Sequence, residues 1–219
     1  DSGHGTHTAS SVLSDGGANG EGTGVAPADN LVFQATENWA TISMYCRMFG
    51  GWPAEGYFLT GLPNDLRDMY QQAYGAGARI HSNSWGSAQA GVYTTDSANT
   101  DDFVWDNPDM TVTFSAGNAG TDANANGVVD NDSIGSPATA KNVITVGASE
   151  NDRGGDYACD TSLTYTSQDA YQAGQTCGSM GGNQVDFLGT WGQRYGDSFT
   201  ADPLYSDVTA GNQEQMASW

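Results

Sequence analysis

The sequence predicts an α/β fold built on a mostly parallel sheet. Short apolar runs rich in β-branched and aromatic residues alternate with stretches of helical pattern along residues 63–151. Each of these helical stretches separates two consecutive strand candidates. A strand, a helix and a further strand at this spacing imply crossover connections, which place neighbouring strands parallel.

The first part of the chain predicts one helix, one loop and one strand. Residues 4–13 have helical potential, because their apolar residues can form one buried face. Residues 14–24 are rich in glycine and predict a flexible loop. Residues 25–38 predict a turn that leads into a buried strand, "NLVFQA".

Residues 63–87 contain the clearest supersecondary unit. Asn64 or Asp65 can cap a helix that two downstream glycines end, and a strand resumes at 78–85. One face of this helix is apolar and consists of Leu66, Met69, Tyr70 and Ala73. The segment therefore predicts a helix that packs one face against the core and leads into a strand of the sheet.

A second unit of the same kind follows. Residues 94–107 predict a helix, residues 110–118 the next strand and residues 141–151 a further one. Residues 38–61 are aromatic and rich in glycine without a clear period, and residues 151–213 are polar with few periodic apolar residues. We interpret these last two segments as loop insertions.

The charge of the chain restricts its partners. The 219 residues include 26 acidic and 6 basic side chains, a formal net charge of -20 at pH 7. Such a surface repels phosphate backbones and anionic lipids, and no apolar run approaches the ~20 residues of a membrane span. We therefore expect neither nucleic acid nor a membrane as partner, and an extracellular setting, high salt or bound calcium would suit the composition.

The chain has three cysteines, too few for a disulfide scaffold. Cys159 and Cys177 lie in one polar region and could pair, although spacing alone does not establish that geometry. Cys46 would then remain as a thiol.

Three short motifs carry chemical groups. "HGTH" places His4 and His7 at the start of the first predicted helix, "SNSWGS" follows the strand through Ile80, and "SAGNAG" follows the strand through Phe114. Ligands of parallel sheets gather at the carboxyl ends of strands, where small residues let the backbone approach a substrate. Each motif alone also fits a helix start, a strand end or a turn.

Together and in this order, the motifs resemble the subtilisin-like serine proteases, the subtilase family. "GHGTH" is similar to that family's histidine motif, "NSWG" to its substrate-binding strand, "SAGNAG" to its oxyanion asparagine motif, and "IGSPATAKNVITVGAS" to the segment that follows. The resemblance covers residues 1 to about 150. It implies a three-layer α/β fold with a mostly parallel central sheet and helices on both faces, and cleavage of polypeptides by a serine endopeptidase.

The resemblance assigns roles to individual residues. His4 would be the general base, and Asn118 would donate a hydrogen bond to the oxyanion. The backbone that would bind an extended substrate and wall its pocket belongs to Ser84, Trp85, Gly86, Ser115, Ala116 and Gly117. His7 would be structural, and a zinc site of the two histidines is a rival interpretation without a third ligand.

The family's triad also needs an aspartate upstream of the histidine motif and a serine in a downstream "GTSMA" motif, and neither motif is in the sequence. Asp1 matches no catalytic position, and "GSMGG" around Ser179 lacks the threonine and precedes the expected place. We therefore expect residues 1–219 to be a partial catalytic domain, incomplete at both ends and inactive alone. The alternative is a non-catalytic secreted domain that binds calcium or peptides on a protease scaffold. An extracellular location and a prodomain outside the chain are further expectations.

"DANANGVVDNDS" has the spacing of a calcium loop. The predicted oxygen ligands are Asp122, Asn124, Asn126, the Val128 carbonyl and Asp130. Ser133 stands where an EF-hand has its bidentate glutamate, and Asp132 could substitute for it. We expect a structural Ca²⁺ here, and the alternative is a solvated acidic loop.

Overall fold

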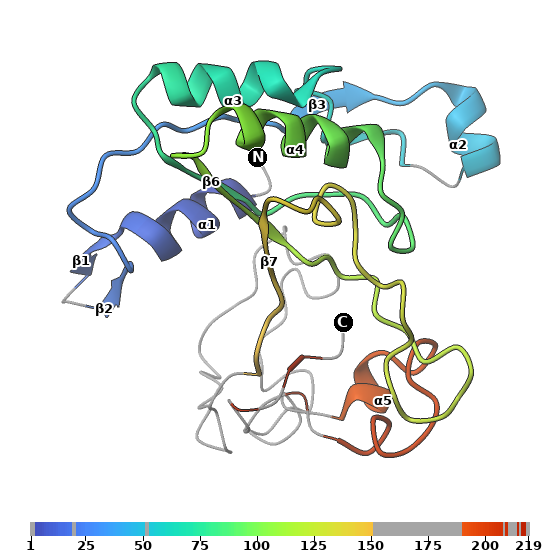
Figure 1. The fold of residues 1–219 in the computed structure, drawn as a ribbon. Helices are drawn as coiled ribbons and strands as arrows, with labels where there is room; N and C mark the ends of the chain where they lie inside the picture. Colours follow the sequence, from blue (N-terminus) through green and yellow to red (C-terminus); the bar gives the residue numbers. More distant parts are fainter. Residues whose placement is uncertain are drawn as a thin grey trace. The chain divides into compact units, whose positions relative to one another are not determined.

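The computed structural model divides the chain into two compact units, Asp1–His81 and Ser82–Trp219. Figure 1 shows the fold. The residues that the structure describes are 3–18, 21–50, 53–150, 190–207, 209, 214, 216 and 217.

The first unit contains helices and two antiparallel hairpins. Its elements are α1 (His4–Leu13), β1 (Asp15–Ala18), β2 (Glu21–Thr23), β3 (Asn38–Thr41), α2 (Met44–Gly50), β4 (Glu55–Phe58) and α3 (Leu66–Gly75). β1 pairs with β2 and β3 pairs with β4, both antiparallel. The predicted helix at 4–13 is confirmed, but the buried face expected of it is not, because none of its residues is buried.

The prediction of a loop at residues 14–24 is wrong. β1 and β2 form a short hairpin there, with Asp15 opposite Thr23. Gly17 N donates to the Asp15 carboxylate (2.9 Å), a local bond that holds the first strand. Glycine content alone predicted flexibility, but an antiparallel pair needs only two neighbouring segments of the chain.

The prediction of a buried strand within residues 25–38 is also wrong. The turn is present, since Asp29 N donates to Ala26 O (3.1 Å). The apolar run after it forms no strand with any described segment, and Leu31 and Phe33 are 54% and 56% exposed. A strand needs a partner for its backbone, and apolar composition does not supply one.

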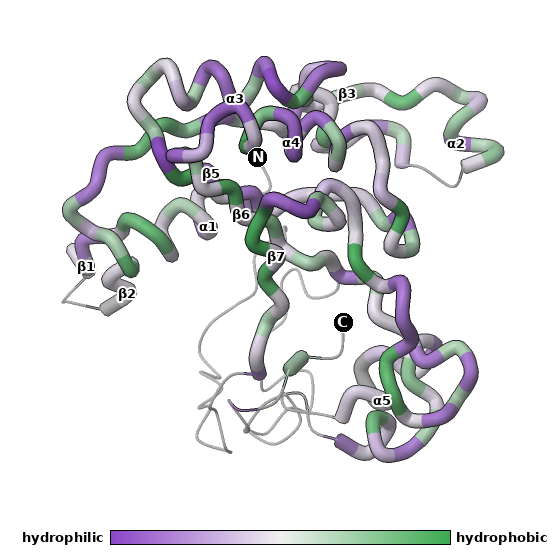
Figure 2. The backbone as a smooth tube through the Cα atoms, in the orientation of Figure 1, coloured by the Kyte–Doolittle hydropathy of each residue, from purple (hydrophilic) through white to green (hydrophobic). Residues whose placement is uncertain are grey.

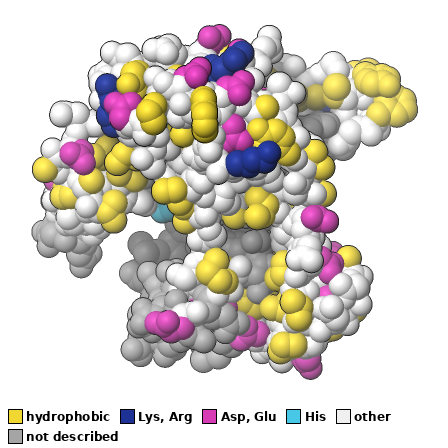
Figure 3. Space-filling model, in the orientation of Figure 1, with side chains coloured by type: hydrophobic (Ala, Val, Ile, Leu, Met, Phe, Trp, Pro, Cys, Tyr) yellow, Lys and Arg dark blue, Asp and Glu magenta, His cyan; other side chains and the backbone are white. Residues whose placement is uncertain are grey.

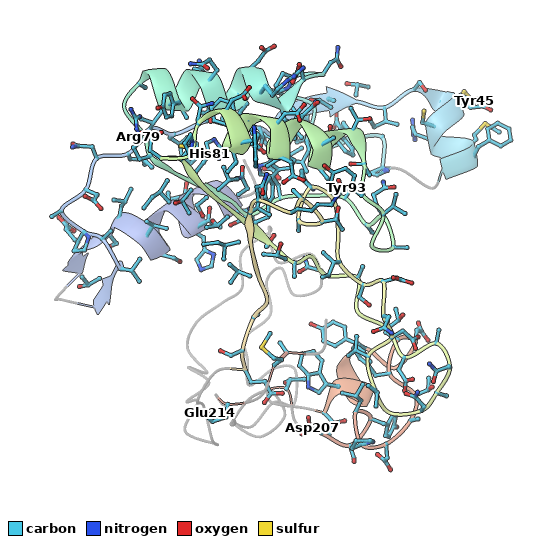
Figure 4. The ribbon with its side chains drawn as sticks, in the orientation of Figure 1. Tyr45, Arg79, His81, Tyr93, Asp207 and Glu214 are labelled. Carbon is cyan, nitrogen blue, oxygen red and sulfur yellow. The ribbon has the colours of Figure 1, made fainter. Side chains whose placement is uncertain are left out.

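Residues 38–61 contain the hairpin of β3 and β4 with α2 between them. The rings of Trp39 and Tyr57 meet edge to face across the hairpin, with centroids 5.1 Å apart. α2 has no buried residue, and hydrophobic side chains gather over it in Figure 3. Figure 4 labels one of them, Tyr45, which is 72% exposed. That this segment is an insertion stays a prediction.

α3 agrees with the sequence in cap, length and face. Asp65 is its N-cap, and Leu66, Met69, Tyr70 and Ala73 are its buried residues. The Tyr70 ring meets the His81 ring edge to face at 5.1 Å. The 3.6-residue period and the cap were therefore sufficient to predict this helix.

The second unit contains the sheet, and the boundary between the units falls within its first strand. The elements are β5 (Ile80–Asn83), α4 (Thr95–Asp106), β6 (Thr111–Ser115), β7 (Ile144–Val146) and α5 (Trp191–Arg194). The strand order is β5-β6-β7, and β6 pairs parallel with β7. The predicted α/β fold of subtilisin type is thus confirmed, and Figure 2 shows hydrophobic residues concentrated in β6 and β7.

Two groups of buried apolar residues lie in the second unit. Val112 and Phe114 of β6 are buried along with residues of α4 and of the segment before β7. A separate cluster contains Trp191, Phe199 and Leu204. Among the described residues no helix is both long enough and apolar enough to cross a membrane.

Most of the predicted insertion at 151–213 is outside the described residues, as are Cys159, Cys177 and Ser179. Cys46 is a free, exposed thiol.

Candidate active site

His4 is the first residue of α1, where the sequence places it. Gly3 precedes it as the N-cap, and its carbonyl accepts from His7 N (3.0 Å) to form the first helical turn. Both imidazoles are exposed. Because a residue in the first turn projects from the helix end, the His4 ring is accessible from solvent.

Residues 84–86 follow β5 directly, so the predicted substrate strand continues from the sheet. The Trp85 ring is half-buried and meets the Phe114 ring of β6 edge to face, with centroids 5.4 Å apart. The buried Asn83 donates through Nδ2 to Thr113 O (3.1 Å). These contacts hold the start of the predicted substrate strand against β6.

Residues 115–117 and Asn118 continue from the end of β6 in the same way. Ala116 N donates to Val146 O and Ala116 O accepts from Gly135 N, both at 2.9 Å. Gly117 has φ 113°, a value that side chains disfavour, and it turns the chain into the exposed Asn118. Asn118 is therefore an exposed residue three positions beyond the end of β6.

The segment around Ser136 connects the two strand ends. Ser136 and Ser87 exchange two backbone hydrogen bonds of 2.9 Å, one residue beyond the substrate strand. The neighbouring Gly135 bonds to Ala116, as above. The structure thus brings both predicted pocket walls onto one supporting segment. His4 belongs to the first unit, so its approach to Asn118 stays a prediction.

Hydrogen bonds between its own residues close the predicted calcium loop. The buried Asp122 carboxylate accepts from Asn126 N (2.9 Å) and Gly127 N (2.8 Å). The Asp130 carboxylate accepts from Ala123 N (2.7 Å) and from the Asn124 amide. The two carboxylates and the side chains of Asn124 and Asn126 therefore belong to one loop, residues 122–130, that its own hydrogen bonds close. We call this loop the ring.

Gly127, the sixth residue of the loop, has φ 77°, and a Cβ there would lie 1.9 Å from Asp202 O. Only glycine fits this position, and a glycine at position six makes the sharp turn of a calcium loop. Asp132 Oδ1 lies 3.1 Å from where a Cβ of Gly91 would stand, and Gly91 is outside residues 122–130.

Among the described residues no group of three or more His, Cys, Asp or Glu side chains could hold a metal ion. The ring has two carboxylates, and the other proposed ligands are amide and carbonyl oxygens. This donor set suits a hard cation such as Ca²⁺ better than a transition metal.

Sequence reasoning missed a set of buried polar contacts between α4 and the segment that precedes β7. Asp101 in α4 is only 8% exposed, and its carboxylate accepts from Lys141 N, Asn142 N and the Tyr93 hydroxyl. That last hydrogen bond raises the pKa of Tyr93 above its ordinary value of 10.0. One signal in the sequence could have revealed these contacts. Ser97, Thr100 and Asp101 are spaced by three residues and one residue, which places them on the same face of α4, and that face is buried.

Comparison with known proteins agrees with the motifs. The family model described as "Subtilase family" matches residues 1–216.

The curated relatives are much longer proteins. "Serine protease/ABC transporter B family protein tagD" of Dictyostelium discoideum is 41% identical over 92 residues, which are 40% of this chain and 4% of that protein. The tagB and tagA proteins of the same description and organism are 38% and 34% identical over 92 and 89 residues, which are 4% and 5% of their lengths. The match to each therefore covers 40% of this chain and only a small part of the relative.

Proposed function

Because the chain belongs to the subtilase family of serine proteases, we propose that it forms the substrate-binding and base-carrying part of a serine endopeptidase. The aspartate and serine of a Ser-His-Asp triad would come from parts of the intact protein beyond this sequence. The observation that carries the proposal is the common support of residues 84–86 and 115–117 by the segment at Gly135 and Ser136. Two strand ends braced in this way would offer an edge along which an extended peptide can lie.

In this proposal each group has one task. His4 takes the proton of the serine hydroxyl as it attacks the peptide carbonyl and returns it to the leaving amine. Asn118 donates to the oxygen that becomes negative in the tetrahedral intermediate. The backbone of residues 84–86 pairs with the substrate and places the scissile bond between His4 and Asn118.

The test is covalent labelling of the intact protein by an organophosphorus serine reagent. We expect labelling of the wild type and its loss in His4→Ala, because the serine is not activated without a base. His7→Ala is the matched control on the same helix and should be labelled like the wild type. Undiminished labelling of His4→Ala contradicts the role of His4.

Asn118→Ala tests the second group. Removing one oxyanion donor lowers kcat by about 10² to 10³-fold in a subtilisin, and we expect a loss in this range, taken from that relative. A wild type that binds peptides but is never labelled would favour the non-catalytic binding domain instead.

We further propose a structural Ca²⁺ in the ring of residues 122–130. Asp122, Asn124, Asn126, the Val128 carbonyl and Asp130 would hold it, and the ion would rigidify the loop. Chelation should lower the melting temperature of the intact protein, and Asp122→Asn should abolish this dependence on chelator. Asp132→Asn is the control, and its melting temperature should still fall when chelator is added. An equal melting temperature with and without chelator excludes the site.

The acidic composition and the polypeptide substrate favour an extracellular location and a prodomain outside this sequence. The measurement is the distribution of the intact protein between cells and medium, with the mass of each form. Exclusive recovery inside the cell, at full mass, would contradict both.

A further inference from the structure

Helix α4 has a polar interior face in a unit whose other buried positions are mostly apolar. Ser97 and Thr100 are fully buried and Asp101 is 8% exposed. Buried carboxylates are costly unless several hydrogen bonds compensate for their loss of water. The partners of these side chains therefore indicate what the face holds in place.

The Asp101 carboxylate holds two consecutive backbone N–H groups. Oδ1 accepts from Lys141 N (2.8 Å) and Asn142 N (2.6 Å), and Oδ2 accepts from the Tyr93 hydroxyl (2.8 Å) and, at 3.0 Å, from Lys141 N. The Asn142 side chain donates back to Asp101 O (3.4 Å). Figure 4 labels Tyr93 on the segment that leads into α4. We call these contacts of Asp101 with residues 141 and 142 the clamp. The clamp fixes the chain two residues before β7 begins at Ile144.

A line of hydroxyls fixes the same segment a few residues earlier. Ser136 Oγ lies 2.5 Å from Thr94 Oγ1 and 3.2 Å from Ser97 Oγ. Ser97 Oγ lies 2.8 Å from Thr139 Oγ1, which donates to Val92 O (3.0 Å). The start of α4 thus holds residues 136–139 and its middle holds residues 141 and 142.

The segment held in this way supports both proposed pocket walls. It pairs with Ser87 on one side through Ser136 and with Ala116 on the other through Gly135. Beyond the clamp, β7 pairs with β6, with Val146 opposite Ser115. A shift of the segment would therefore move residues 84–86 relative to residues 115–117.

We propose that Asp101 is a positioning residue that sets the separation of the two pocket walls, and with it the side chain accepted before the scissile bond. The inference rests on the proposed protease function and extends it from the pocket walls to their support. A carboxylate suits the task because its two oxygens can bond adjacent N–H groups and so fix the register of the segment.

The test compares two peptide substrates that differ only in the residue before the scissile bond, phenylalanine or alanine. Values of kcat and KM are measured for the intact protein and for Asp101→Ala. A variant that is merely less stable has a smaller folded fraction, which lowers both kcat/KM values by the same factor. A displaced wall changes their ratio, and we expect a change of about tenfold, in the range that pocket fit controls.

Three variants complete the experiment. Asp106→Ala removes an exposed acid from the same helix and should keep the wild-type ratio. Asp101→Asn should keep a ratio close to that of the wild type, because the amide oxygen can still accept from Lys141 N and Asn142 N. Tyr93→Phe should change the ratio in the same direction by a smaller factor, because the carboxylate loses the hydroxyl that orients it but keeps its backbone contacts.

The two proposals fail in different ways. Normal labelling by the organophosphorus reagent, together with an unchanged ratio in Asp101→Ala, overturns the positioning role and leaves the protease function. A wild type that is not labelled overturns both. If Asp101→Ala does not fold, Tyr93→Phe decides, and an unchanged ratio in that variant counts against the role.

Discussion

At the scale of single residues, Asp65 links the cap of α3 to an ion pair. Its carboxylate accepts from Arg67 N (3.0 Å) and receives the guanidinium through Nε (2.9 Å) and Nη2 (2.7 Å). The hydrogen bonds from the Arg67 side chain, and then that from its backbone, hold the pKa of Asp65 below its ordinary value of 3.8. Both side chains are exposed, at 38% and 49%, so solvent weakens the pair.

The lowered pKa of Asp65 predicts how stability depends on pH. The folded state prefers the ionised carboxylate, so its contribution is complete above 3.8 and is lost as pH falls through the lower folded pKa. Asp65→Ala should lower the melting temperature at pH 7 and show a smaller further decrease below pH 3.8. Thermal unfolding from pH 7 to pH 2 measures both effects. Asp29→Ala, an exposed acid in a turn, should follow the wild type, and parallel curves for Asp65→Ala and wild type would contradict the prediction.

At the scale of elements, β6 combines the core with the candidate site. Val112 and Phe114 are buried while Thr111 and Ser115 are exposed, the alternation of a strand with one covered face. Phe114 is also the ring partner of Trp85. The same side chain therefore belongs to the core and supports the predicted substrate strand.

Phe114→Ala should lower the free energy of unfolding by about 3–5 kcal/mol, because it leaves a cavity at a site that is 1% exposed. Urea denaturation of the intact protein measures the change. Thr111→Ala on the exposed side of the strand should stay within about 0.5 kcal/mol of the wild type. A small loss in Phe114→Ala would mean that the surroundings collapse into the space.

Elements set by local chemistry were predictable, and those set by distant partners were not. The cap and face of α3 lie within one helix, and the sequence located both. The run at residues 31–35 has strand composition, but its pairing depends on another segment, and no described segment pairs with it. The same holds for the site. Motifs predicted roles for residues 84–86 and Asn118, whereas the contact of Asp101 with Lys141 spans 40 residues and leaves no local pattern.

At the scale of the whole molecule, the dominant feature is unbalanced charge. The chain carries 26 acidic and 6 basic side chains. One of the basic ones, Arg67, forms the ion pair with Asp65, and Lys141 lies with Nζ 4.7 Å from the centre of the Tyr93 ring. Most carboxylates thus repel one another, and the repulsion is greater in the compact state.

Added salt should therefore raise the melting temperature of the intact protein by screening this repulsion. At 1 M ionic strength the Debye length is about 3 Å, against about 30 Å at 0.01 M. Thermal unfolding in increasing NaCl, with chelator present to exclude calcium, measures the effect. KCl should act equally if screening is the cause. A melting temperature that falls with either salt would show that attractive pairs outweigh the repulsion.

The hydroxyls beside α4 have one possible order of protons. The Thr139 hydroxyl donates its single proton to Val92 O, so it must accept a hydrogen bond from Ser97. For the same reason Ser97 must accept from Ser136, and Ser136 must accept from Thr94. The four hydroxyls then donate in one order, from Thr94 to the Val92 carbonyl, and Thr94 is the first donor of the line. That residue is also the N-cap of α4, where the peptide dipoles leave partial positive charge. The residue that caps the start of the helix is therefore also the first donor of this line of hydroxyls.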